Sequence, residues 1–233
     1  MKQICKLVVM LLLTFTAGVQ AQLVTYPESL NPGIPHNDDY TVRVRIPGGE
    51  WKDLFEYNVQ VDIDNVQKAS MVQFDMGSVV EVMVKKNNGS VREVTIRPLS
   101  KGIEYKQIQN AILFTLEKPQ YLSIEFDGDR LHNLHLFANP LETEKYDKEA
   151  KGIMYFSPGV HRPKDLPNNQ IRIPGNTIVY LAPGAVVKAK LLVDKAENVR
   201  IIGRGILDHP IRGIEVTDSK NVLIDGITVV TPE

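Results

Sequence analysis

The amino-acid sequence predicts an all-β protein: an N-terminal antiparallel β-sandwich followed by the first coils of a parallel β-helix. Two observations predict this fold class. The first half of the chain carries many short strands with alternating apolar residues, separated by turns rich in Gly, Asn and Asp. The second half carries one short unit three times, beginning at Asn176, Asn198 and Asn221, with offsets of 198 − 176 = 22 and 221 − 198 = 23 residues. A period in the low twenties is typical of a solenoid.

Each repeat consists of Asn, an apolar strand, a Gly or Pro-Gly corner and a second apolar strand. The second strands are predicted at residues 185–189, 206–207 and 227–230. No single coil can bury its own apolar face, so coils stack about 4.8 Å apart and pair strand on parallel strand. An Asn at the same place in each coil can then join its amide to the next in a ladder. A leucine-rich repeat has a similar period, but its Leu-x-x-Leu-x-Leu frame is missing here.

The N-terminal residues 1–21 are predicted to be a secretory signal peptide rather than part of the fold. Lys2 and Lys6 precede the apolar run 7–18, and small residues lead to a cleavage site near Ala21. A lipoprotein needs a cysteine directly after the apolar run. The single cysteine, Cys5, lies before that run, so no lipid anchor is expected. The mature protein is therefore expected to be secreted or periplasmic and to hold together without disulfides.

The charge balance points away from nucleic acids and anionic membranes as partners. The chain has 27 Lys and Arg and 28 Asp and Glu, interspersed along its length, with a formal net charge of −1. No second apolar stretch is long enough to span a bilayer. We expect a neutral or moderately charged ligand, and the oligomeric state stays open.

Residues 22–140 are assigned to the β-sandwich. Strands are predicted at 40–46 and 59–63, where apolar and polar residues alternate. A hairpin is predicted from 79–84 and 91–96, because Asn87-Asn88-Gly89 between them tolerates positive φ. A second antiparallel pair is predicted from 121–126 and 131–137.

The charged residues 141–151 are predicted to be a linker or one short helix, and 152–233 the first coils of the β-helix. Residues 153–156 and 171–173 read as strands of an atypical first coil that caps the solenoid.

Several segments carry a resemblance to known families. Residues 155–160 (YFSPGV), 176–186 (NTIVYLAPGAV) and 202–208 (IGRGILD) resemble the opening coils of the polygalacturonase-like, right-handed β-helix glycoside hydrolases. Residues 97–100 (RPLS) and 133–140 (NLHLFANP) are similar to the sandwich that precedes the β-helix in the dextranase and isopullulanase family. Together these similarities cover nearly all of the mature chain.

This resemblance implies inverting hydrolysis of a polysaccharide such as pectin or an α-glucan. In these families the catalytic aspartates come from coils beyond the Gly-x-Gly-x-x-Asp segment, and the sequence contains no Asn-Thr-Asp, Asp-Asp or Gly-His-Gly signature. We therefore assign no catalytic residue, no cofactor and no metal ligand, and interpret the chain as the N-terminal part of a hydrolase that lacks the catalytic coils. The alternatives are a non-catalytic carbohydrate-binding protein and a structural β-helix.

Five polar residues permit a catalytic or metal-binding interpretation beside a structural one. Asp208 and His209 form an acid/base pair or simply a polar corner after the Gly turn, and the corner is favoured. Asp225, followed by Gly, is interpreted as a turn residue. His132 and His135 are three apart on a predicted strand and point to opposite faces, which disfavours a shared metal.

Two further patterns are each more simply explained by folding. Asp127-Gly-Asp129 resembles a fragment of a calcium loop without its distal Glu, and a hairpin turn is favoured. Trp51, Phe55 and Tyr57 offer either a sugar-stacking platform or a buried aromatic cluster, and the buried cluster is favoured.

Overall fold

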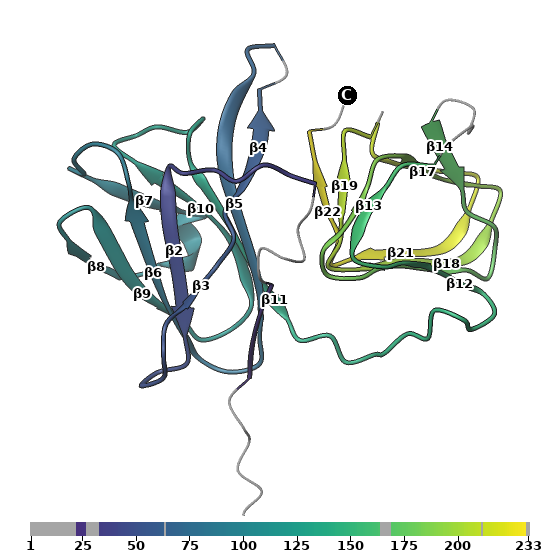
Figure 1. The fold of residues 1–233 in the computed structure, drawn as a ribbon, viewed down its shortest axis with the longest axis horizontal. Coiled ribbons are helices and arrows are strands. Elements are labelled where there is room, and N and C mark those ends of the chain that lie inside the picture. The colour runs from purple at the N-terminus through teal and green to yellow at the C-terminus, as the bar shows by residue number, and fades with distance from the viewer. Residues whose placement is uncertain (1–21, 27–32, 63, 164–168, 211, 232–233) are drawn as a thin grey trace, which may run out of the picture.

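The computed structural model describes residues 22–26, 33–62, 64–163, 169–210 and 212–231, and the predicted signal peptide, 1–21, lies outside these ranges. Within them the chain is all-β, with one 3₁₀ turn at Leu99–Lys101. A sandwich of two sheets stands beside a triangular solenoid (Figure 1). No helix in the described part is long and apolar enough to cross a membrane.

The sandwich consists of a six-stranded and a five-stranded sheet. The six-stranded sheet contains β1 (Leu23–Thr25), β4 (Tyr57–Val61), β5 (Gln67–Met76), β7 (Val94–Arg97), β10 (Gln120–Phe126) and β11 (Leu134–Pro140). The five-stranded sheet contains β2 (Tyr40–Arg45), β3 (Lys52–Asp53), β6 (Val80–Lys86), β8 (Tyr105–Ile108) and β9 (Ala111–Leu116).

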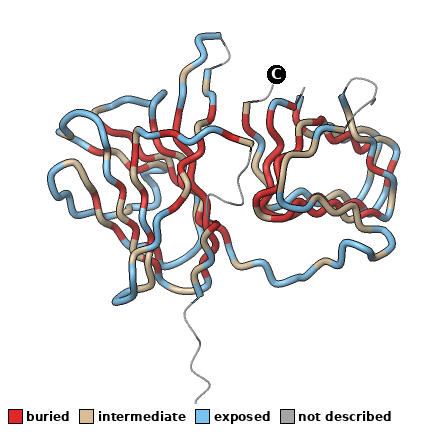
Figure 2. Tube along the Cα trace, viewed as in Figure 1, coloured by how far each residue is buried: buried red, intermediate tan, exposed pale blue. Residues whose placement is uncertain are grey.

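The first core lies between these two sheets, as the red segments in Figure 2 show. Alternate residues of each strand enter it, such as Val42 and Val44 of β2 and Phe74 and Leu136 of the opposite sheet. All four are fully buried, which is the pattern expected of half-buried strands. The pairs are antiparallel except that β11 runs parallel to β5, into the middle of the six-stranded sheet.

The hairpin predicted from 79–84 and 91–96 is wrong. Strand β6 pairs with β2 and β9, whereas β7 pairs with β10 in the other sheet, so the turn between them carries the chain across the sandwich. Asn87 is held by the start of β2, because its backbone N–H donates to Asp39 O at 2.8 Å and its side chain to Asp38 O at 2.9 Å. Turn chemistry fixes a reversal of direction and not the sheet that the next strand joins. The predicted pair 121–126 and 131–137 is confirmed as β10 and β11.

The solenoid has three parallel sheets, one strand of each coming from every coil. The first contains β12 (Ile153–Phe156), β15 (Ile178–Leu181), β18 (Glu197–Gly203) and β21 (Lys220–Asp225). The second contains β13 (Gly159–His161), β16 (Ala185–Val187), β19 (Ile206–Asp208) and β22 (Thr228–Val230). The third contains β14 (Gln170–Arg172), β17 (Lys190–Asp194) and β20 (Ile214–Thr217).

The register of the coils matches the sequence repeat. Val179 lies opposite Ile201, and Ile201 opposite Ile224, at the offsets of 22 and 23 residues read from the sequence. The sequence pattern predicted two strands per repeat. Of the third sheet it anticipated only the first strand, at 171–173, which is β14, and it missed β17 and β20. The first coil, β12 to β14, caps the stack as expected.

The solenoid interior is a second, continuous apolar core. Val179, Leu191, Val199 and Leu207 are fully buried in it and come from all three sheets. The corner after β18 requires glycine, because a Cβ at Gly203 would lie 2.0 Å from the carbonyl oxygen of the preceding coil and its φ is +125°.

The predicted asparagine ladder is present on the outside of the solenoid. Asn198 Nδ2 donates to Asn176 Oδ1 at 3.0 Å, and Asn221 Nδ2 donates to Asn198 Oδ1 at 2.7 Å. All three residues have left-handed backbone angles, with φ of 56°, 57° and 52°. Asn tolerates this conformation better than most residues, so one residue type satisfies both the turn and the ladder.

Replacing the central residue of the ladder tests both functions. We expect Asn198→Ala to lower the free energy of unfolding by about 2 kcal/mol, since it removes two side-chain hydrogen bonds and puts a Cβ without a polar group at positive φ. Asn198→Gly, the matched control, removes the bonds but relieves the backbone and should cost about 1 kcal/mol less. Urea unfolding measures the free energy of unfolding of both variants. If the two variants lose the same stability, the positive φ at position 198 contributes nothing to the cost.

Candidate functional site

The sandwich and the solenoid meet over the outer face of the six-stranded sheet. Tyr57 and Met71, on β4 and β5, point away from the sandwich core and pack against Val186 and Ile206 of the second solenoid sheet. These side chains are buried, so the two bodies share a third apolar cluster. Figure 1 shows β5 and β11 facing the edge of the solenoid that carries β13, β19 and β22.

A buried ion pair fixes the position of this contact. Arg204, in the corner between β18 and β19, donates from Nε to Asp75 Oδ1 of β5 at 2.8 Å. Both residues are at most 5% exposed. The same guanidinium donates to the carbonyl oxygens of Pro140 at 2.6 Å and Gly203 at 3.0 Å, and Gln73 donates its side-chain amide to Arg204 O at 3.2 Å. The charge of Arg204 is therefore neutralised and its donors are occupied.

The predicted linker lies on the outer face of the first solenoid sheet, and we call residues 141–146 the strap. Glu142 accepts a hydrogen bond from the Tyr180 hydroxyl at 3.1 Å. Glu144 accepts two from Arg200, at 3.0 and 2.8 Å, and the ring of Tyr146 stacks 4.7 Å from that of Tyr180. The strap is extended, and turns follow it at residues 148–152; no α-helix forms in the described part of this region.

The two acidic side chains of the strap, Glu142 and Glu144, have pKa values shifted in opposite directions. Burial raises the pKa of the Glu142 carboxyl, and nearby Arg204 only partly offsets this effect. Hydrogen bonds from Arg200 and then Tyr146 lower the pKa of Glu144 from 4.5 to about 2. Glu144 is therefore a carboxylate at neutral pH that ties the strap to the solenoid.

A groove runs along the junction between the two bodies, and we call it the junction groove. A hollow of about 120 Å³ lies between the strap and β18–β21, and a second of about 360 Å³ lies between Phe137 and Asn139 on the sandwich and residues 224–229 on the solenoid. Asp225 lines both. A third hollow, of about 560 Å³, continues over the sandwich and shares Tyr121 and Phe137 with the second.

Aromatic side chains form the sandwich wall of the junction groove. Tyr121 of β10 is 53% exposed, and its ring meets the Phe137 ring edge to face at 5.5 Å. Their sequence neighbours Leu122 and Leu136 point into the sandwich core, so alternation turns both rings outward. His135, next to them on β11, has its pKa lowered by burial.

Asp208 and His209 lie together, as their adjacency in the sequence suggested, but outside the junction groove. The Asp208 carboxylate is 4% exposed; it contacts His209 Nδ1 at 2.6 Å and also accepts a hydrogen bond from Lys188 of the preceding coil. Lys188 was not anticipated from the sequence. The ammonium group of Lys188 neutralises the Asp208 carboxylate, and the pair links two neighbouring coils. This is the polar corner that the sequence analysis favoured. Asp225, interpreted as a turn residue, ends β21 and lies exposed in the groove.

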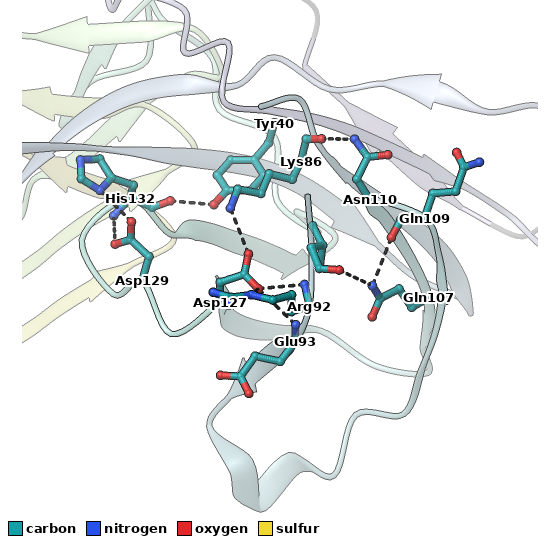
Figure 3. A network of polar contacts seen from close by, with 11 residues as sticks. Tyr40, Lys86, Arg92, Glu93, Gln107, Gln109, Asn110, Asp127, Asp129 and His132 are labelled. Atoms are coloured by element: carbon teal, nitrogen blue, oxygen red, sulfur yellow. Dashed lines mark hydrogen bonds and ion pairs between the residues drawn. The ribbon is translucent and has the colours of Figure 1, made fainter. Parts of the chain in front are cut away.

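The Asp127-Gly-Asp129 segment is a turn at one end of the sandwich (Figure 3). Asp127 Oδ1 accepts the backbone N–H of Arg92 at 2.8 Å and of Glu93 at 3.2 Å, and these bonds lower its pKa. Asp129 accepts the backbone N–H of His132 at 3.0 Å and contacts its ring nitrogen at 2.9 Å. Both carboxylates are thus used to hold the turn.

The histidines considered for a metal site and the aromatic residues considered for sugar stacking do not form such sites. His132 lies before β11 and His135 within it, and the described residues contain no cluster of three or more metal-ligating side chains. Tyr57 is 1% exposed in the contact between the two bodies, next to Phe55 at 4.9 Å, while Trp51 lies apart under Arg45 at 4.3 Å. The favoured interpretation, a buried aromatic cluster, therefore holds for Phe55 and Tyr57, whereas Trp51 is not part of that cluster.

Comparison with known proteins identifies the fold. No family model and no curated protein matches the sequence. Among solved structures, the chain is similar to Dex49A from Penicillium minioluteum, a dextranase, with a TM-score of 0.60 and 20% identity. The match covers 79% of this chain and 48% of Dex49A, so the chain spans about half of that protein. The similarity supports a parallel β-helix fold.

Removing the carboxylate that neutralises Arg204 should destabilise the protein strongly. We expect Asp75→Asn to lower the free energy of unfolding by about 3–5 kcal/mol, because it leaves a buried guanidinium without a counter-charge. The matched control is Asp53→Asn, which breaks an exposed pair with Arg43 and should cost at most about 1 kcal/mol. Denaturant unfolding measures the stability of both variants. If Asp75→Asn loses as little stability as Asp53→Asn, the buried pair has no structural role.

The contact between Glu144 and Arg200 should depend on pH. The folded pKa of Glu144, about 2, is below its ordinary value of 4.5, so its contribution to stability is complete above about pH 4.5. It is lost as the pH falls through about 2. We therefore expect Arg200→Ala to be less stable than wild type at neutral pH, and the difference to shrink at low pH, as measured by thermal unfolding. A difference that is constant with pH would contradict this ion pair.

Proposed function

We propose that this chain is the N-terminal part of a secreted, inverting glycoside hydrolase that degrades a polysaccharide of the pectin or α-glucan class. The observation that carries the proposal is the order of the two bodies, a sandwich followed by a parallel β-helix, which aligns with the dextranase Dex49A over 79% of the chain. The predicted signal peptide and the sequence resemblance to β-helix glycoside hydrolases support it further.

The chemistry of inversion explains why we assign no catalytic residue within this chain. It requires two carboxyl groups about 6.5–9.5 Å apart, one to protonate the leaving oxygen and one to activate water. Asp75 is paired with the buried Arg204, Asp208 with the half-buried Lys188, and Glu144 with Arg200. Glu142 and Asp225 line the same hollow, but Glu142 belongs to the strap, where it accepts a hydrogen bond from the Tyr180 hydroxyl at 3.1 Å. We therefore propose that the catalytic pair belongs to further coils of the same hydrolase.

A second candidate is a non-catalytic carbohydrate-binding protein. The exposed Tyr121 and its neighbour Phe137 favour it, because aromatic faces pack against the C–H faces of sugar rings and need no catalytic group. Both candidate functions require affinity for a polysaccharide, but only the hydrolase cleaves it.

We expect the full chain to bind a polysaccharide without cleaving it. Affinity electrophoresis in gels containing dextran, pullulan or polygalacturonate measures binding, and release of reducing ends measures hydrolysis. Retardation without new reducing ends is the expected result. Efficient hydrolysis by this chain alone would contradict the assignment of the catalytic pair to other coils, and no retardation in any of the gels would argue against a carbohydrate role.

A further inference from the structure

We propose that residues 33–38, which we call the arm, are held between the two bodies by an acid-favoured clamp, in which the protonated ring of His36 bridges the carboxylates of Glu56 and Asp38. The clamp is closed at mildly acidic pH and loosens as the pH rises through neutrality. It is a property of the fold and is independent of the proposed function.

The first residues of the arm lie against the solenoid. In Figure 1 the arm belongs to the purple chain that crosses from the edge of the solenoid to β2. A Cβ at Gly33 would lie 2.5 Å from Val160 Cγ2 of β13, so the backbone of the arm approaches the first coil closely. Ile34 is 7% exposed and belongs to the apolar cluster that joins the two bodies. Release of the arm would therefore uncover part of that contact.

The last residues of the arm pair with the start of β4 on the sandwich. The backbone N–H of Asn37 donates to Glu56 O at 2.9 Å, and that of Asn58 donates to Pro35 O at 2.8 Å. Two backbone hydrogen bonds are a short ladder, and such a ladder opens easily unless side chains support it. His36, between these two bonds, supplies the support.

His36 faces a carboxylate with each of its ring nitrogens. Nε2 lies 3.1 Å from Glu56 Oε2, and Nδ1 lies 2.9 Å from Asp38 Oδ1. An ionised carboxylate only accepts hydrogen bonds, so both contacts are hydrogen bonds only when both ring nitrogens carry a proton. Neutral imidazole has one N–H and can serve one of the two carboxylates. The arrangement therefore favours the charged ring.

Glu56 is the partner through which the proton of His36 affects stability. Its side chain is 7% exposed, and its Oε1 accepts the backbone N–H of the buried Val42 at 2.6 Å. The ring of Phe55 packs against the imidazole at 5.2 Å, and within the described ranges no charged group other than Glu56 and Asp38 pairs with His36. When His36 loses its proton, a buried carboxylate is left without a counter-charge, which is costly.

His36 and Glu56 give the pH dependence the same sign. The clamp needs the charged ring, and free imidazole loses its proton near pH 6.5. Burial raises the pKa of the Glu56 carboxyl, and the hydrogen bonds from Val42 and His36 offset this only in part. A carboxyl that binds its proton more tightly in the folded protein contributes stability that is lost as the pH rises. The arm should thus be tighter at pH 5.5 than at pH 8.

The experiment measures hydrogen exchange of the Asn37 and Asn58 amides in the full chain at pH 5.5 and pH 8. Protection factors remove the ordinary effect of pH on exchange. We expect those of the wild type to be about fivefold lower at pH 8, the ratio that corresponds to about 1 kcal/mol for a partly exposed ion pair. In Glu56→Gln the side-chain oxygen can still accept from Val42 and the amide N–H can donate to neutral His36. This variant should therefore show equal protection at both pH values.

Two further variants complete the test. His36→Gln removes the titrating ring, so its protection factors at the two pH values should also be equal. His132→Gln is the matched control, because His132 faces Asp129 at 2.9 Å but lies outside the arm, and it should keep the wild-type difference. Equal wild-type protection at both pH values would show that no clamp exists. A wild-type difference that persists in Glu56→Gln or in His36→Gln, or that disappears in His132→Gln, would place the responsible proton elsewhere.

Discussion

The buried pair of Arg204 and Asp75 is the interaction on which the arrangement of the two bodies depends. Arg204 extends from the corner of a solenoid coil and Asp75 from the outer face of the sandwich, so their bond sets which coil lies against which strand. An apolar contact alone tolerates sliding, whereas a charge pair in a dry interface is costly to break and accepts one register. The position of Asp225 opposite Phe137, and with it the junction groove, follows from that register.

Much of the fold could be predicted because its constraints are local or periodic. Asn176, Asn198 and Asn221 gave the correct coil register, since each coil repeats the same turn and the same strand. Two strands of the third solenoid sheet, β17 and β20, were missed because they begin as Lys-Leu-Leu and Ile-Glu-Val and mix charged with apolar residues differently. The placement of β6 and β7 in different sheets was missed for a different reason. Alternation of apolar and polar residues identifies a half-buried strand but does not tell which strand it pairs with.

The candidate site could hardly be predicted from the sequence, because its walls come from distant segments. Asp75 and Arg204 are 129 residues apart, and Tyr121 and Asp225 belong to different bodies. The aromatic residues that the sequence pattern singles out, Phe55 and Tyr57, lie in the contact between the bodies. One signal was available: alternation along β10 places Tyr121 on the face opposite to Leu122, outside the sandwich core.

The asparagine ladder has a direction. In each bond the later coil donates its amide N–H and the earlier coil accepts with its carbonyl oxygen. Conversion of Asn176 to aspartate by deamidation would therefore preserve its acceptor, but the same chemical ageing at Asn198 or Asn221 would replace a donor with a second acceptor and set two oxygens against each other. The repeat thus tolerates chemical damage at its first rung and is sensitive to it at every later one.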